Sequence, residues 1–293
     1  MKEKLELRQI RDFGTVIGDI FVFIRQNIKP LLKSYFSICG IFLLGGLISL
    51  VIFKIQAQQI QGRRVGTGIF SNSMSGMLFT WEYLLMILFS ILSYVSMYVT
   101  VLSFIALYIE KGNVAPNTNE VWSYFRYYFF RVFGSSIGLG LLLVICFAVC
   151  LLPGIYVFPA FTLFFPVMML ENGSFSHSFE RSFKLLSGEW WVSAATILVI
   201  YFIFYVTSMI VQLPTVILEM VSTLSHTESA IKSLYTLFAA IFTCLAQIFV
   251  LIPIIGSALI YFNLIERKES IGLLGRINNF GSQGPVHDHP EEY

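Results

Sequence analysis

The chain has 293 residues, of which 56% are hydrophobic and only 12% are charged, and its mean hydropathy is +0.77. Soluble domains carry about 25% charged residues, so this composition all but excludes a single soluble globular domain. The formal net charge of +2 gives no strong attraction for nucleic acid, and four cysteines are too few for a disulfide scaffold. The composition therefore predicts an integral membrane protein.

Six apolar stretches set the expected fold. A helix needs about 20 apolar residues to cross a hydrocarbon core about 30 Å thick. The stretches are continuously apolar, whereas the strands of a membrane barrel alternate. We therefore expect an all-α protein with six transmembrane helices, near residues 35–55, 78–109, 132–152, 154–170, 191–213 and 234–265.

The same reading divides the chain into three parts. Residues 1–34 form an N-terminal tail with an amphipathic helix, residues 35–266 the transmembrane domain, and residues 267–293 a flexible tail. With six spans, 15 of the 19 Lys and Arg residues fall on one side of the membrane. Because cytoplasmic loops carry the excess of positive charge, both termini are predicted to be cytoplasmic.

Three segments on that side have the apolar spacing of an amphipathic helix. The first covers residues 13–28, the second follows Pro116, and the third follows Gly173. Such helices either lie in the headgroup layer or cap the bundle, and the sequence leaves both roles open. Pro30 marks an end or a bend of the first segment. The expected caps are Thr118 or Asn119 before the second segment and Ser174 before the third.

Polar residues inside the expected spans are few. Gln247 is the most deeply placed strongly polar side chain, in the sixth span. Pro159 and Pro166 interrupt the fourth span and Pro253 the sixth, and such breaks occur both at transporter sites and as simple packing kinks. We favour packing, and for Gln247 a hydrogen bond between helices.

Small residues offer a further contact surface. Gly134 and Gly138 lie at the beginning of the third span, and a stripe of serine and threonine runs along one face of the second span. Small residues let another helix approach closely on these faces. A packing seam within the chain and a homo-oligomer both remain open. The stripe consists of Ser90, Ser93, Ser96, Thr100 and Ser103.

One segment resembles a known family. Residues 170–191 read LENGSFSHSFERSFKLLSGEWW. This pattern is similar to the segment between the fourth and fifth spans of the glycerophosphodiester phosphodiesterase membrane-domain family and its stand-alone, YciC-like bacterial relatives. Asn172 departs from the family, which places Glu and Gly together. The matching residues are Glu171, Gly173, Arg181, Ser182, Leu185, Gly188, Trp190 and Trp191.

The resemblance extends loosely over residues 29–266 and implies a membrane module of poorly defined role. Some family members carry a soluble phosphodiesterase domain, which has no counterpart in this sequence, so no enzymatic activity is implied. Residues 5–14 and the acidic tail are also similar to uncharacterised inner-membrane proteins of Bacteroidota. We therefore expect the bacterial cytoplasmic (inner) membrane as the location.

Two interpretations of this segment stay open. In the structural one, Arg181 pairs with Glu180, Gly188 ends a helix, and Trp190 and Trp191 anchor the fifth span at the headgroups. In the other, the segment is a docking or lipid-headgroup site.

The sequence contains no recognisable catalytic or metal motif, so we expect no catalytic residue, no metal site and no cofactor. The leading hypothesis is a non-enzymatic scaffold or accessory subunit. Its partners would be membrane lipids and other membrane proteins, with no role for nucleic acid. The alternative is a lipid or small-solute transporter that uses the kinked fourth and sixth spans, near Gln247 and Pro253.

Overall fold

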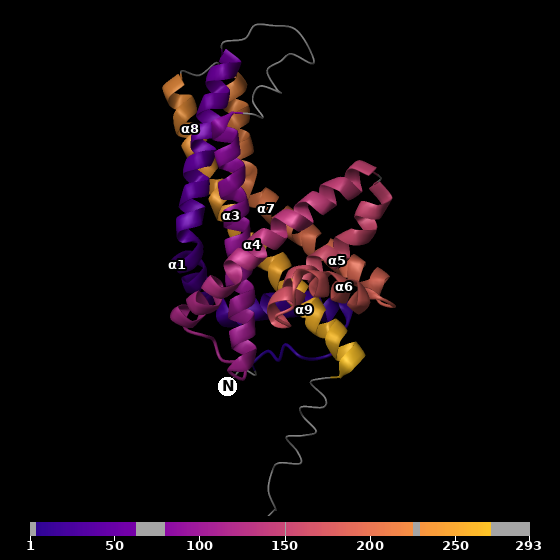
Figure 1. Cartoon of the computed structure of the whole chain (residues 1–293). Helices are drawn as coiled ribbons and strands as arrows, with labels where there is room; N and C mark the ends of the chain where they lie inside the picture. Colours follow the sequence, from indigo (N-terminus) through magenta and orange to yellow (C-terminus); the bar gives the residue numbers. More distant parts are fainter. Residues whose placement is uncertain (1–3, 63–79, 150, 225–228, 271–293) are drawn as a thin grey trace, which may run out of the picture.

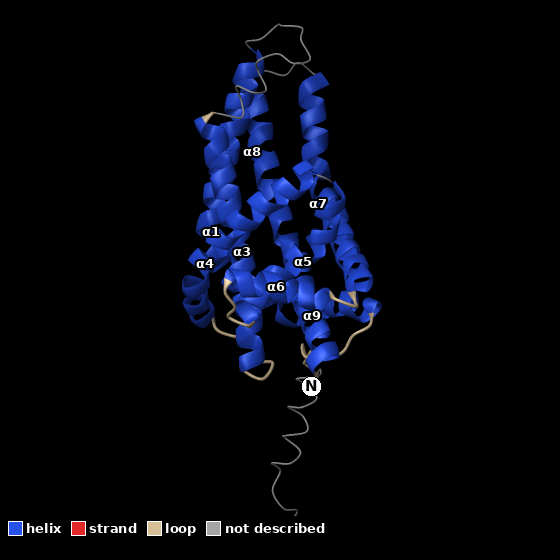
Figure 2. Ribbon diagram, turned by 45° about the vertical axis from the view of Figure 1, so that its right-hand side comes forward, coloured by secondary structure: helices blue, strands red, loops and turns tan. Residues whose placement is uncertain are grey.

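The computed structural model describes residues 4–62, 80–149, 151–224 and 229–270, and every regular element among them is helical (Figures 1 and 2). The expected all-α class is confirmed. The elements are α1 (Phe13–Gly62), α3 (Trp81–Glu110), α4 (Thr118–Val149), α5 (Leu151–Leu170), α6 (Phe175–Leu186), α7 (Trp190–Leu224), α8 (Ser229–Ala246), the 3-10 helix η1 (Gln247–Val250) and α9 (Leu251–Glu269).

Five helical stretches are long and apolar enough to cross a membrane, which makes the chain a multi-pass membrane protein. The fourth expected span is different, because its apolar part, Gly154–Leu170, is shorter than the other five. The five long stretches are Phe13–Ala57, Trp81–Glu110, Thr118–Ala148, Trp190–Leu218 and Tyr235–Glu269.

The beginning and the end of the described chain lie at the same end of the molecule. The backbone N–H of Arg11 donates to Asn263 Oδ1 at 2.8 Å, and Arg267 Nη2 donates to the carbonyl of Arg11 at 3.0 Å. Figure 1 shows the N-terminal segment and the last turns of α9 at the lower end. We call this the charged end, because it also carries Lys111, Glu171, Arg181 and Glu189.

Helix α1 joins the first amphipathic segment to the first expected span without a break, and Pro30 lies inside it. Phe23 packs edge-to-face on Phe104, while Cys39 contacts Thr100 at 3.3 Å. In a straight helix, the sixteen residues from Phe23 to Cys39 would rise about 24 Å. Their partners Phe104 and Thr100, however, are only one turn apart on α3. Helix α1 therefore turns as it passes α3, and Figure 1 shows its indigo start crossing the lower end before the helix rises.

The second amphipathic segment is likewise continuous with the third expected span, in α4. Its cap differs from the expectation, because Thr118 and Asn119 lie inside the first turn. Asn117 takes the cap position: its carbonyl accepts from Val121 N at 3.2 Å, and its N–H donates to the Glu120 carboxylate at 2.8 Å. The contact from Glu120 is one half of a capping box, in which the acidic residue three positions on satisfies the cap N–H.

Only the third amphipathic segment forms a separate helix, α6. Ser174 caps it as expected, since its hydroxyl accepts from His177 N at 3.4 Å. At its other end Gly188 adopts φ +85°, a conformation that glycine reaches without strain. Lys268 completes this end by donating to the carbonyls of Lys184 and Ser187, at 2.6 and 2.8 Å.

Part of the serine and threonine stripe of α3, at Ser93 and Thr100, packs against α1. Ser93 Oγ donates to the carbonyl of Phe42 at 2.9 Å. Gly45 makes the close approach possible, since a Cβ there would lie 2.4 Å from the ring of Phe89. In contrast, a Cβ on Gly134 would meet nothing within 4 Å, whereas a Cβ on Gly138, one turn later, would lie 3.5 Å from the ring of Phe175.

The boundaries expected between tails and membrane domain, at residues 34 and 266, fall inside α1 and α9. The chain therefore passes from the charged end into the bundle through continuous helices. The flexible tail expected over 267–293 lies largely outside the described residues, which end at residue 270.

Candidate functional site

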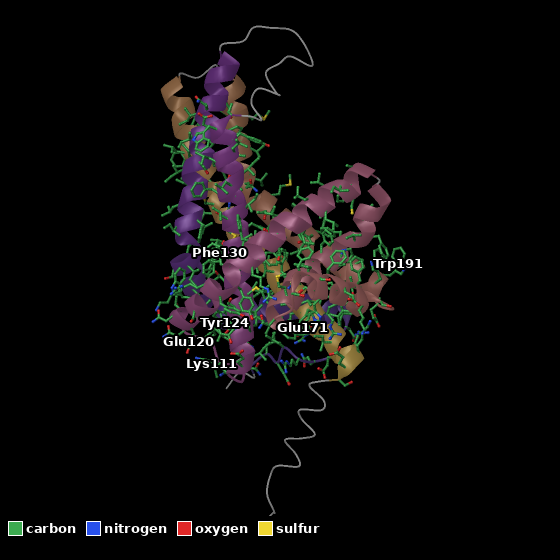
Figure 3. The ribbon with its side chains drawn as sticks, viewed as in Figure 1. Lys111, Glu120, Tyr124, Phe130, Glu171 and Trp191 are labelled. Atoms are coloured by element: carbon green, nitrogen blue, oxygen red, sulfur yellow. The ribbon has the colours of Figure 1, made fainter. Side chains whose placement is uncertain are left out.

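The segment that carries the family resemblance lies at the charged end, where Glu171 and Arg181 form an ion pair. Arg181 Nε donates to Glu171 Oε1 at 3.1 Å, and the hydroxyl of Tyr261, from α9, donates to the same oxygen at 3.2 Å. His177 Nε2 lies 3.2 Å from Glu171 Oε2. Glu171, labelled in the lower part of Figure 3, therefore connects the end of α5 to α6 and α9.

Arg181 also pairs with Glu269 at the end of α9. The expected partner was Glu180, but adjacent helical residues point in different directions, and Arg181 instead reaches the two carboxylates of Glu171 and Glu269. Burial alone lowers the pKa of Arg181, but the hydrogen bonds that it donates to Glu269 and Glu171 raise the pKa above its ordinary value. The guanidinium is thus a permanent cross-link between α6 and α9.

Gly173 occupies a crowded corner between α5 and α6. Its carbonyl accepts from Arg131 Nη2, and Arg131 Nη1 also donates to Asn172 Oδ1 at 2.7 Å. A Cβ on Gly173 would lie 2.5 Å from the ring of His177, so a larger residue would displace that ring. The glycine thus serves local packing.

Ser182 does not join the charged cluster. Its hydroxyl donates to the carbonyl of Ser178 at 2.7 Å, and both serines are buried against the bundle. These small side chains let α6 pack closely, and neither offers a hydroxyl to a ligand.

The two tryptophans lie at the start of α7. Trp190 stacks on Tyr156 of α5 with ring centroids 5.3 Å apart, and its Nε1 donates to the carbonyl of Tyr156 at 3.2 Å. Trp191 is 80% exposed and stands edge-on to Trp190 (Figure 3). Together with neighbouring residues of α5 and α6 they line a pocket of about 460 Å³. An exposed tryptophan beside a charged helix end is typical of a headgroup anchor.

Gln247 and Pro253 lie apart from this cluster, where α8 breaks into η1 and α9 resumes. The hydrogen bond that we expected from the Gln247 side chain is not the one observed. Its backbone carbonyl accepts from the Tyr35 hydroxyl at 3.4 Å, and its buried Oε1 has no partner. Pro253 stands in the first turn of α9, where a missing N–H costs no helix bond.

A pocket between three helices was not anticipated from the sequence. It is a groove of about 630 Å³ between α3, α4 and α5, and none of its lining residues is charged. It opens at the surface, since Tyr94, Ile137 and Leu141 are 43%, 46% and 62% exposed. We call it the α3–α4–α5 groove; its lining is Ser90, Ile91, Tyr94, Val95, Tyr98, Val132, Ser136, Ile137, Leu139, Gly140, Leu141, Leu143, Phe161 and Phe165.

The serine hydroxyl groups of the groove are engaged with the protein. Ser90 and Ser136 each donate to a carbonyl of their own helix at 2.7 Å. The rings of Tyr94 and Tyr98 are 5.2 Å apart and pack against each other. The groove therefore presents an apolar surface. The spacing of Tyr94 and Tyr98, four residues apart, was the available sequence signal.

Within the described ranges, no three His, Cys, Asp or Glu side chains come together as a metal site would require. Comparisons with protein-family models, curated proteins and solved structures gave no match. The resemblance to the phosphodiesterase membrane-domain family therefore stays a prediction.

Proposed function

We propose that this chain is a non-enzymatic protein of the bacterial inner membrane that binds a membrane lipid in the α3–α4–α5 groove. Six apolar segments are embedded in the bilayer, and both ends of the chain face the cytoplasm. The orientation is supported by the 15 of 19 basic residues on one side and by the charged end, where Arg11 meets α9.

The groove is the observation that carries this proposal. Its volume of about 630 Å³ lies in the range of roughly 300–1,000 Å³ that is typical of small-molecule sites. Its lining comes from membrane-embedded helices and is uncharged, so it fits the uncharged acyl chain that the bilayer itself supplies. Leu141, 62% exposed at the rim, leaves the groove open toward the surrounding lipid.

Gly140 provides the test. A Cβ at this lining position would meet nothing within 4 Å, so the groove has space there that a larger side chain would fill. The Gly140→Leu variant should lose most of its cross-linking to a diazirine-bearing fatty acid that cells have incorporated into their lipids. Gly134→Leu is the matched control, since Gly134 is equally open but does not line the groove.

Equal cross-linking of wild type, Gly140→Leu and Gly134→Leu at matched protein levels would refute lipid binding in the groove. The cross-linked peptides supply a second criterion. They should come from α3, α4 and α5, and label spread evenly over α7 as well would show only general contact with lipid.

A scaffold or accessory subunit is the second candidate, and it is favoured by the construction of the charged end. Ion pairs fix this end as one surface: Arg11 with Asp19 at 2.6 Å, Lys111 with Glu120 at 2.6 Å, and Arg181 with Glu171 at 3.1 Å. A fixed surface of this kind suits a protein partner. Native mass spectrometry after gentle extraction separates the candidates: stoichiometric proteins favour the scaffold, and a retained lipid without protein favours lipid handling.

Transport along the sixth expected span has less support. Helix α5, which contains Pro159 and Pro166, contributes Phe161 and Phe165 to the groove, but no lining residue comes from α8, η1 or α9. If Gln247 and Pro253 lie on a solute pathway, replacing either should reduce flux in proteoliposomes at unchanged protein level. We expect no such reduction.

A further inference from the structure

Helices α5 and α6 run side by side in opposite directions. Phe175 at the start of α6 lies 5.1 Å from Phe164, and Phe179 one turn later lies 6.1 Å from Phe161, as ring centroids. Helix α6 is in turn held to the charged end by Arg181 and by Lys268. Its partner α5 therefore lies close to the charged end along much of its length.

The other end of α5 is also low in the molecule. Tyr156 stacks on Trp190, which directly follows Glu189, and Glu189 pairs with Arg267 of the charged end at 3.4 Å. Two residues further along α5, Phe158 packs on Tyr201 with ring centroids 5.5 Å apart. Helix α5 thus crosses α7 between Trp190 and Tyr201, which are separated by about 16 Å of helix rise.

The height of the turn between α4 and α5 follows from this crossing. The midpoint of the crossing on α7, halfway between Trp190 and Tyr201, is about 8 Å above Trp190. The residues of α5 from Tyr156 back to Leu151 add a further rise of at most about 8 Å. The turn then reaches about 16 Å, roughly half of a hydrocarbon core of about 30 Å. In both ribbon views the facing ends of α4 and α5 lie well below the upper ends of α1, α3 and α8 (Figures 1 and 2).

The hairpin is nevertheless built for lipid. From Val132 to Leu170 the sequence contains no Asp, Glu, Lys or Arg. Near the turn, Val144, Ile145 and Ile155 are 64%, 62% and 56% exposed. Large apolar side chains at this exposure belong in hydrocarbon rather than water.

We propose that α4 and α5 form a re-entrant hairpin that enters and leaves the bilayer at the charged end and inserts into that leaflet alone. The interaction partner of its exposed apolar surface is the acyl region of one leaflet. The lipids that reach the rim of the α3–α4–α5 groove accordingly come from that leaflet. The placement of the hairpin does not depend on whether the groove binds a lipid.

Cysteine accessibility tests the inference on the full chain with its four native cysteines replaced. Single cysteines are placed at Ala148 near the turn, at Trp81 at the far end of α3, and at Lys111 at the charged end. With a membrane-impermeant maleimide, Trp81→Cys should react from one side only and Lys111→Cys from the other. Ala148→Cys should react from neither side until detergent is added.

Labelling of Ala148→Cys together with Trp81→Cys would show that the hairpin crosses the bilayer, and labelling together with Lys111→Cys would place it outside the hydrocarbon. Either result overturns the proposal.

A second measurement distinguishes shielding by lipid from shielding by protein. The fluorescence of bimane attached at Ala148, an exposed position, should be quenched most by lipids that are spin-labelled deep in the acyl chain. Absence of quenching by any of these lipids would also overturn it.

Discussion

The buried guanidinium of Arg11 gives the sharpest stability prediction. Its side chain is 0% exposed and pairs with Asp19, which is 15% exposed, at 2.6 Å between Nε and Oδ2. Nη1 donates to the carbonyls of Leu7 and Gln9, at 2.7 and 3.2 Å. The N-terminal segment is thereby folded around one arginine, whose charge Asp19 balances.

The Asp19→Asn substitution keeps the size of the side chain and removes its negative charge. The cation is then left with neutral carbonyl acceptors in a buried place. Breaking a buried ion pair costs about 3–5 kcal/mol, and the partial exposure of Asp19 reduces this to about 2–3 kcal/mol. For a chain of this size, with about 2–4 °C per kcal/mol, the melting temperature should fall by roughly 4–12 °C.

The assay is thermal unfolding of the full chain in detergent micelles, followed by tryptophan fluorescence. Asp12→Asn is the matched control, because Asp12 is exposed and lies next to Arg11 in the sequence. Its melting temperature should stay at the wild-type value. If the two variants unfold at the same temperature, the ion pair does not stabilise the charged end and the reasoning fails.

Three further predictions concern helix contacts. Gly256→Ala should lower stability by about 1–2 kcal/mol, since the new Cβ would lie 2.8 Å from Ile200, whereas Gly18→Ala meets nothing and should leave the melting temperature unchanged or raised. Lys268→Met should speed amide exchange in the last turn of α6 about fivefold, for a loss of about 1 kcal/mol, because two carbonyls lose their donor; unchanged exchange would contradict the cap. Gln247→Leu removes a buried oxygen without a partner, so the melting temperature should hold or rise, and a clear fall would reveal a bond to that side chain.

The sequence by itself determined the features that depend on near neighbours and on solvent. Apolar runs predicted helices in a membrane, and helices are what the structure shows. Ser174 and Gly188 predicted the two ends of α6, since a cap hydroxyl and a left-handed glycine act within one turn. The serine stripe left a packing seam and an oligomer contact open, and Ser93 of this stripe bonds to Phe42 within the chain.

Tertiary structure decided what joins distant parts of the chain. Arg181 pairs with Glu269, which is 88 residues away in the sequence. The hydrophobic periodicity of the sequence does not predict such a distant partner. The length of 154–170 suggested an ordinary span, but contacts with α6 and with Trp190 hold α5 low in the molecule. The α3–α4–α5 groove exists because three helices meet at particular angles. The apolar surface of a helix favours its transfer out of water, but this effect has no direction. It therefore does not determine which neighbour the helix packs against or how deeply the helix enters the membrane.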